Sequence, residues 1–183
     1  MSETLANPIE ILDFWWQAGA SKWFARDDTF DRKIRDRFLT TIEAAQRGEL
    51  DAWADTAHGS LALILLLDQF TRNVFRNDGR AFEADGRALD HARRAVAAGY
   101  DKAFPKDARA FFYLPFEHAE DMDAQQESVD LFRKTGNREF HLYALIHLDV
   151  IRRFGRFPHR NAVLGRKTTP EEQAFLDDGG FSA

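Results

Sequence analysis

Helix start and stop signals recur along this chain, and they constrain its fold more than any other feature. Asn7 precedes Pro8, which predicts a helix start, because asparagine caps the first amides and proline suits the first helical position. Gly19 predicts the end of that helix, since glycine readily adopts the left-handed conformation that closes a helix. The same reasoning predicts helices from residue 27 or 28 to about 47, from 60 to about 75, over 82–98, from 105, from 121 or 123 to 132, over 138–154, and a short one opened by 169–172.

Apolar side chains recur at helical spacing in these segments, and no stretch shows the sustained alternation of a half-buried strand. The run Leu61–Leu67, LALILLL, is apolar all round, which predicts a central buried helix. It is far shorter than the roughly 20 residues that cross a bilayer. We therefore expect an all-α fold of about eight or nine helices, paired as antiparallel hairpins, in a single domain over residues 1–183 with its core at 8–176.

Two local features are expected to modify this pattern. Pro115 lies inside a helical segment, where its missing amide hydrogen predicts a kink or break near Tyr113. Such a break would reorient the polar residues that follow it. The C-terminal tail, residues 179–183, is expected to be loosely held.

The composition excludes several kinds of site. The chain has no cysteine, which excludes disulfides, thiolate nucleophiles, iron–sulfur clusters and cysteine-ligated zinc. It contains no Gly-x-Ser-x-Gly elbow, no Gly-x-Gly-x-x-Gly fingerprint and no P-loop pattern. The net charge of −5 makes nucleic-acid binding an unlikely function. Without a secretory signal pattern, we expect a cytoplasmic protein that does not enter a membrane.

The densest positive charge lies in residues 152–161, RRFGRFPHRN. Guanidinium groups suit bidentate contact with carboxylates or phosphates, and His159 and Asn161 add further polar groups. Residues 110–132 contain no lysine or arginine but several carboxylates. Two interpretations stay open: the two segments pair and hold the fold together, or they form a polar site.

A second group of polar residues follows the apolar run. Asp68 and Arg72 are four residues apart at the end of the predicted buried helix, so their side chains face the same way. Arg72 and Arg76 could together hold an anion, or Asp68 and Arg72 could form an ordinary ion pair within the helix.

A third group surrounds a histidine. His118 lies among carboxylates, and this arrangement could form a general base with an orienting acid such as Glu117 or Glu120. The metal-binding patterns His-Glu-x-x-His and Glu-x-x-His are absent, so no metal site is predicted. His141 and His147 are expected to be core or surface histidines, because their spacing of six residues points them in different directions.

A resemblance to a known family rests on four stretches: IEILDFWW, LDQFTRNVFR, FFYLPFEHAED and RFGRFPHRNAVLGRKTTPEEQAFL. They are similar to an uncharacterised bacterial family, a domain of unknown function with an all-helical fold like that of tetratricopeptide-repeat proteins. The match runs from about Pro8 to Leu176. It implies a tetratricopeptide-like array of helical hairpins and implies no activity. The positions that match its motifs are Asp68, Gln69, Arg72, Asn73, Pro115, Glu117, His118, Glu120, Arg156, His159, Arg160 and Asn161.

Three functions are compatible with these residues. The first is a helical binding module for a small anionic ligand or an acidic peptide, working without a cofactor. The second is a metal-independent hydrolase or other acid–base enzyme, with His118 or His159 as the base and Arg72 or Arg156 stabilising an anion. The third is a purely structural charge network. The predicted ligand-binding residues are Asp68, Arg72, Asn73, Arg76, Glu117, His118, Glu120, Arg156, His159, Arg160 and Asn161.

Overall fold

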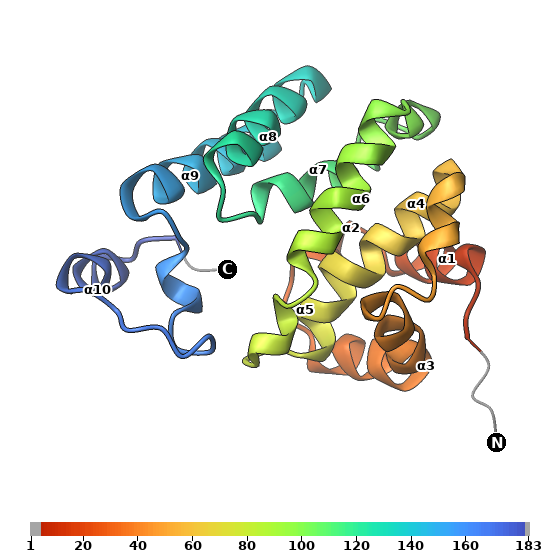
Figure 1. Ribbon diagram of the computed structural model, residues 1–183, viewed down its shortest axis with the longest axis horizontal. Helices are drawn as coiled ribbons and strands as arrows, with labels where there is room; N and C mark the ends of the chain where they lie inside the picture. The colour runs from red at the N-terminus through yellow and green to blue at the C-terminus, as the bar shows by residue number, and fades with distance from the viewer. Residues whose placement is uncertain (1–4, 182–183) are drawn as a thin grey trace.

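The computed structural model describes residues 5–181, and every regular element in that part of the chain is a helix (Figure 1). The α-helices are α1 (Pro8–Ala18), α2 (Ala20–Trp23), α3 (Asp28–Gln46), α4 (Ala57–Ile64), α5 (Thr71–Val74), α6 (Asp85–Ala97), α7 (Ala110–Glu117), α8 (Met122–Thr135), α9 (Arg138–Phe154) and α10 (Pro170–Asp177). The 3-10 turns are η1 (Asp51–Asp55), η3 (Gly79–Ala81), η4 (Tyr100–Ala103) and η5 (Pro158–Arg160), and η2 (Leu65–Phe70) is π-helical. Because the backbone stays helical from α4 through η2 into α5, residues 57–74 form one continuous helix. The described chain thus has nine helices, and the predicted all-α fold is confirmed.

The helix ends follow the capping signals in the sequence. The Asn7 side chain accepts hydrogen bonds from the amides of Ile9 and Glu10, and the Glu10 carboxylate accepts one from the Asn7 amide. The Asn137 side chain caps α9 by accepting from the amides of Glu139 and Phe140, and α9 ends at Gly155, whose φ of 69° lies in the left-handed region. Glycine adopts this conformation without the steric cost that a side chain brings, so α9 ends there.

The continuous helix 57–74 lies at the centre of the fold, as its apolar run predicted. Residues 61–70 are buried, and α1, α3, α6 and α7 pack around them (Figure 1). The Trp15 ring packs on Phe70 and on Phe111, each with a centroid distance of 5.5 Å. Although this region is apolar, no helix within residues 5–181 is both long and hydrophobic enough to cross a membrane.

Pro115 does not end α7, so the predicted break near Tyr113 is wrong, while the predicted kink stays a prediction. The helix continues through Pro115 to Glu117. Proline removes one backbone hydrogen bond and costs about 3 kcal/mol or more inside a helix. Every residue of α7 is buried, and the helix packs against α4, α6 and α8. This packing outweighs the lost bond.

Three predicted helix starts also differ from the structure. The helix expected from residue 60 begins at residue 57, because Thr56 caps it through the amide of Gly59. The helix expected from residue 82 begins at residue 85, after the 3-10 turn η3. The helix expected from residue 105 begins at residue 110, after a turn. In each case a local turn or cap sets the boundary, which apolar spacing does not report.

The C-terminal segment, residues 155–181, includes η5 and α10 and packs on α9 rather than on the central helix (Figure 1). Its apolar contacts form a small cluster apart from the main core, made by Val150, Phe154, Ile151, Phe157, Phe175 and Phe181. The tail that we expected to be loose is therefore packed as far as Phe181. Hydrogen bonds to Asp85 of α6 and to Glu120, in the loop between α7 and α8, join this segment to the rest of the protein. We call this junction the seam, and the candidate site lies along it.

Candidate functional site

Asp68 is a buried carboxylate inside the π-helical segment η2. Its Oδ1 atom lies 2.7 Å from Nδ1 of His118 and 3.4 Å from Nη1 of Arg72, and the Gln69 amide donates to its Oδ2. Burial alone would raise the pKa of Asp68, but His118 and Arg72 outweigh it and hold the pKa below its usual value. Asp68 is therefore an anion at neutral pH. Single π-helical turns inside α-helices are frequent at functional sites.

His118 is the partner of Asp68 at the end of α7, and its side chain is 14% exposed. Burial lowers its pKa, Arg72 lowers it further, and Asp68 opposes both, with a net lowering. The ring is therefore neutral near pH 7. Because the Asp68 carboxylate accepts a hydrogen bond, Nδ1 carries the proton and Nε2 has a free lone pair.

Asp85, in the first turn of α6, joins two arginines from different parts of the chain. Arg72 contacts both of its oxygens at 3.0 Å, and Arg160 reaches Oδ2 at 3.2 Å. Arg160 also stacks over the rings of Phe82 and Phe157, with its guanidinium carbon 4.5 Å from each centroid. Burial lowers the pKa of Arg160 to about 10, which still leaves it charged at neutral pH. One carboxylate therefore compensates two converging guanidinium groups.

Glu117 and His147 form a second acid–histidine pair beside the first. Glu117 Oε1 lies 3.4 Å from His147 Nδ1, which donates to the carbonyl of Tyr143 at 2.8 Å. Burial, reinforced by the charge of Asp68, raises the pKa of Glu117 to about 8, so its carboxyl group is protonated at neutral pH. Burial lowers the pKa of His147 to about 3. Both groups are thus neutral, and Glu117 adds no second negative charge beside Asp68.

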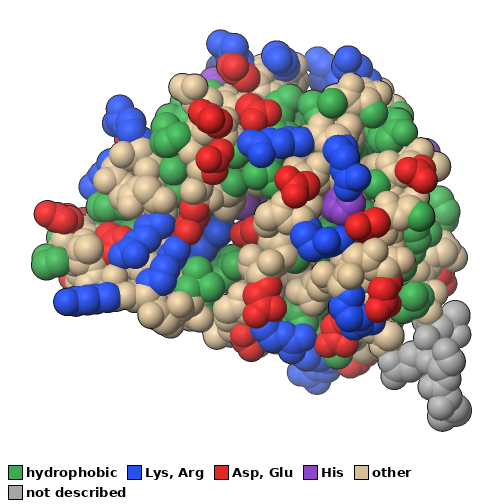
Figure 2. Space-filling view, in the orientation of Figure 1, with side chains coloured by type: hydrophobic (Ala, Val, Ile, Leu, Met, Phe, Trp, Pro, Cys, Tyr) green, Lys and Arg blue, Asp and Glu red, His purple; other side chains and the backbone are tan. Residues whose placement is uncertain are grey.

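Aromatic rings from the C-terminal segment cover this pair. The Phe181 ring lies 4.2 Å from the His147 ring and 5.5 Å from the His159 ring, and Phe157 lies 5.5 Å from His147. Burial, with the charge of Arg160, lowers the pKa of His159 to about 4. The space-filling view shows a furrow between the C-terminal segment and the body of the protein, with part of a histidine visible in it (Figure 2).

These residues define the seam site: Asp68, Arg72, Asp85, Glu117, His118, His147, His159 and Arg160. Six of them were predicted from the sequence, whereas Asp85 and His147 were not. Asp85 resembles an ordinary acidic residue of a first helical turn, and His147 resembles a core histidine, which its burial confirms. Within residues 5–181, no group of three histidine or carboxylate side chains is placed to hold a metal ion.

Two other predicted residues lie outside the seam site, one on α5 and one in the turn that follows it. Asn73 and Arg76 both contact Asp31 of α3, at 2.7 Å for Asn73 and at 2.8 and 3.0 Å for Arg76. They line a surface cavity of about 310 Å³ together with Arg32 and Arg35. Arg72 and Arg76 therefore do not share one anion site.

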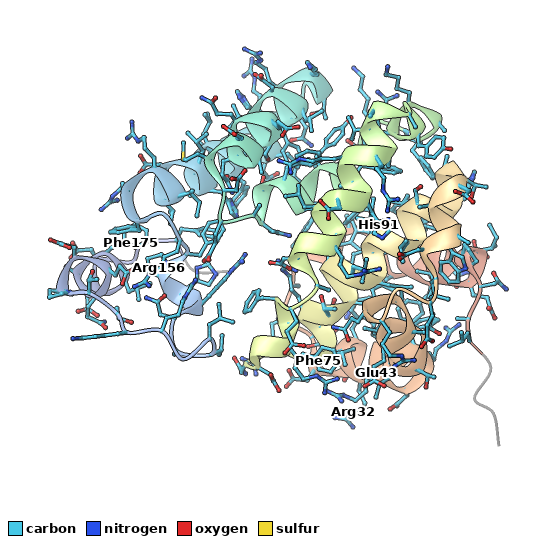
Figure 3. All side chains as sticks on the ribbon, viewed as in Figure 1. Arg32, Glu43, Phe75, His91, Arg156 and Phe175 are labelled. Carbon is cyan, nitrogen blue, oxygen red and sulfur yellow. The ribbon has the colours of Figure 1, made fainter. Side chains whose placement is uncertain are left out.

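The remaining predicted residues stabilise the C-terminal segment. Arg156 lies in this segment, between α9 and α10 (Figure 3), and it contacts both oxygens of Glu172, at 2.6 and 2.9 Å. Asn161 donates to the same carboxylate at 3.1 Å. Glu120 accepts from Arg166 at 2.6 and 3.0 Å and from the Phe157 amide at 2.7 Å. The acidic and arginine-rich segments therefore meet at the seam through Glu120, while Arg156 pairs inside its own segment.

Comparison with known proteins identifies relatives whose activity is not described. A family model described as "Bacterial protein of unknown function (DUF924)" matches residues 11–180. The chain is similar to a solved structure of a protein of unknown function, ATU0120 from Agrobacterium tumefaciens, with 48% identity and a TM-score of 0.91. The similarity covers 94% of this chain and 97% of that one. A search of curated proteins gave no match.

Proposed function

Because this chain belongs to that bacterial family of unknown function, its chemistry has to be argued from the seam site, and we propose that it is an acid–base enzyme with His118 as the base. The observation that carries the proposal is the 2.7 Å contact between His118 Nδ1 and the buried Asp68 carboxylate. A buried carboxylate that accepts from one ring nitrogen fixes the tautomer and orients the other nitrogen toward a substrate. The acid that orients His118 is thus Asp68, not Glu117 or Glu120.

Electrostatics of the site support the same role. A base has to be neutral at the working pH, and the lowered pKa of His118 keeps it so. Asp68 stabilises the imidazolium that forms when Nε2 takes a proton. Because Glu117 is protonated at neutral pH, it places no second negative charge beside Asp68.

Arg72 supplies the group that recognises negative charge. Its side chain is 21% exposed and contacts Asp68 as well as Asp85, so it lies next to the proposed base. We propose hydrolysis of a small substrate that bears an anionic group. His118 Nε2 takes a proton from water as the water oxygen attacks the electrophilic carbon or phosphorus. The bond to the leaving group then breaks, and His118 gives the proton to the leaving group. Arg72 stabilises the oxyanion that develops.

A binding module without turnover is the second candidate, and one observation favours it. Arg72 and Arg160 converge on the single carboxylate of Asp85, which shows that two guanidinium groups can hold one carboxylate at this position. An anionic ligand would then compete with Asp85 for Arg72. The tetratricopeptide-like arrangement and a cytoplasmic location stay predictions under both candidates.

The test measures turnover and histidine ionisation in the same protein. The purified chain is screened with p-nitrophenyl esters and phosphates, and any turnover is compared in His118→Asn, Asp68→Asn and the control His141→Asn. We expect His118→Asn to lower kcat by about 10²–10⁴-fold, the range of general-base catalysis, and the control to have no effect. Histidine ¹⁵N NMR should show His118 with the proton on Nδ1 and a pKa below its ordinary value.

Outcomes separate the two candidates. Turnover that survives in His118→Asn would refute the role of His118 as base. Thermal stabilisation by small carboxylates or phosphates that is lost in Arg72→Ala, with no turnover of any substrate, would favour the binding module instead.

A further inference from the structure

A surface cavity of about 310 Å³ lies between α3 and the end of α5, apart from the seam site. Its lining includes four arginines and two carboxylates, namely Arg26, Arg32, Arg35, Arg76, Asp28 and Asp31. Four positive and two negative charges leave the lining at +2, whereas the whole chain carries −5. A concave surface whose charge is opposite to that of the protein around it concentrates ligands of the other sign, which here are anions.

Both carboxylates of the cavity are already paired with arginines of the cavity. Asp31 accepts from Arg76 at 2.8 and 3.0 Å and from Asn73 at 2.7 Å. Asp28 lies 3.4 Å from Arg26. Because the charges within these two pairs compensate each other, the excess positive charge belongs to the other two arginines.

Arg32 and Arg35 are these two arginines, and neither forms an ion pair with a carboxylate within residues 5–181. Arg32 forms no hydrogen bond in that part of the chain either. Arg35 donates to the backbone carbonyl of Val74, an acceptor without a net charge, and its other N–H groups have no partner there. Since they are three residues apart on α3, the two side chains are neighbours on one face of the helix. Two uncompensated guanidinium groups thus share one wall of the cavity.

We propose that this cavity binds the phosphate group of a small phosphorylated molecule that also carries hydroxyl groups. A phosphate monoester has a charge of about −1.5 to −2 at pH 7, which matches two uncompensated arginines better than the single charge of a carboxylate does. Guanidinium groups also donate to phosphate oxygens in bidentate pairs, which adds directional specificity to the attraction between charges.

The rest of the lining fits a ligand that is polar and small. Val74 is the single apolar residue among the described residues that line the cavity. The lining also includes Asn73 and Asn77, whose side-chain amides can hydrogen-bond to hydroxyl groups. A volume of about 310 Å³ is near the lower end of the range for small-molecule pockets, roughly 300–1,000 Å³. These features favour a phosphorylated sugar or polyol over an apolar ligand.

The cavity and the seam site lie on different faces of α5. Asn73 contacts Asp31 of α3, whereas its neighbour Arg72 contacts Asp85 of α6. Figure 3 shows Arg32 at the lower edge of the molecule, well apart from the C-terminal segment. The phosphate site therefore does not depend on the proposed acid–base activity, and each can be tested while the other fails.

Isothermal titration calorimetry of the purified full chain with glycerol 3-phosphate is the first measurement, with inorganic phosphate and glycerol as comparison ligands. We expect glycerol 3-phosphate to bind with a dissociation constant of about 1 mM or lower, and glycerol not to bind. Inorganic phosphate should bind about tenfold more weakly, because it lacks the contacts of the glycerol hydroxyl groups. No binding of glycerol 3-phosphate at about 10 mM would overturn the proposal. Equally tight binding of inorganic phosphate would refute the ester and identify free phosphate as the ligand.

Substitution of the two uncompensated arginines tests whether the ligand lies in this cavity. Arg32→Gln and Arg35→Gln should each raise the dissociation constant about 10–100-fold, because each removes charged hydrogen bonds to the phosphate. The matched control is Lys33→Gln, which removes the same charge from the same helix at a position that does not line the cavity. Circular dichroism confirms first that each variant is folded. Unchanged binding in Arg32→Gln and Arg35→Gln, or an equal loss in Lys33→Gln, would refute the site.

Two more variants distinguish this cavity from the seam site. Asp28→Asn removes a negative charge from the lining, so glycerol 3-phosphate should bind about two- to fivefold more tightly. Arg72→Ala, in the seam site, should leave this binding unchanged. Binding that is lost in Arg72→Ala but kept in Arg32→Gln would place the phosphate at the seam and overturn the proposal. An affinity that does not rise in Asp28→Asn would also contradict it.

Discussion

Removing Asp85 is the sharpest test of how the seam is held. Asp85→Ala deletes the carboxylate that Arg72 and Arg160 share. Arg72 keeps its contacts with Asp68, namely the carboxylate at 3.4 Å and the backbone carbonyl at 2.6 Å. Arg160 keeps its two aromatic neighbours and loses its ion pair with Asp85, which has a separation of 3.2 Å.

The magnitude follows from the burial of Arg160. Its side chain is 7% exposed, and its pKa of about 10 means that it cannot escape by losing its proton at pH 7. Breaking a buried ion pair by deleting one partner costs about 3–5 kcal/mol, because the other charge is left uncompensated. For a chain of this size, 1 kcal/mol corresponds to roughly 2–4 °C, so the melting temperature should fall by about 6–20 °C.

Urea unfolding followed by circular dichroism measures this loss. Asp123→Ala is the matched control, because Asp123 is also an acidic residue in a first helical turn but is exposed and forms no ion pair with an arginine within residues 5–181. It should cost less than about 1 kcal/mol, which is the helix-dipole contribution alone. The double variant Asp85→Ala with Arg160→Met should be more stable than Asp85→Ala, since the stranded charge is gone. A loss below about 1 kcal/mol for Asp85→Ala would refute the reasoning.

Three further predictions concern protonation. The folded pKa of Glu117 is about 8, above its ordinary 4.5. The stability that Glu117 contributes is therefore full below pH 4.5 and is lost as the pH rises toward 8. Glu117→Gln should remove this pH dependence of the free energy of unfolding, measured in urea titrations. The pKa of folded Glu172 is lowered to about 2, chiefly by the hydrogen bond from Arg156. The contribution of Glu172 to the free energy of unfolding is therefore present above pH 4.5 and is lost as the pH falls toward 2. Glu172→Gln should remove this acid-induced loss of stability in urea titrations. Truncation after residue 180 removes the Phe181 ring from His147, so NMR titration should show the pKa of His147 rising from about 3 toward its ordinary 6.5.

Local signals in the sequence were enough to predict most of the helices. Asn137 and Gly155 mark the two ends of α9 because capping depends on side chains within a few residues of the helix end. Pro115 shows where this reasoning fails. The rule for proline is local, whereas the packing that keeps α7 helical comes from other helices, namely α4, α6, α8 and α9.

The partners within the site could not be predicted for a related reason. Asp68 and His118 are 50 residues apart, and Asp85 and Arg160 are 75 apart. Charge pattern identified Asp68, His118 and Arg160 as candidates, because each lies in an unusual local cluster. It could not select Asp85 from the many acidic residues at helix starts, since only the fold brings that one to the seam.

A structural lock and a chemical site are therefore not exclusive readings of the seam. Arg160 binds Asp85 from the C-terminal segment, Asp85 orients Arg72, and Arg72 lies against the Asp68 carboxylate that orients His118. Each contact holds the next side chain in place, so the lock sets the geometry of the proposed base. Arg160→Met should consequently change the pKa of His118, although residue 160 does not hydrogen-bond to His118. Arg160 shares the Asp85 carboxylate with Arg72. When Arg160 is removed, Asp85 compensates the charge of Arg72 more fully. Because the charge of Arg72 lowers the pKa of His118, the pKa of His118 should rise. An upward shift in the histidine NMR titration is the expected result, and an unchanged pKa would show that the two ends of the chain of contacts are independent.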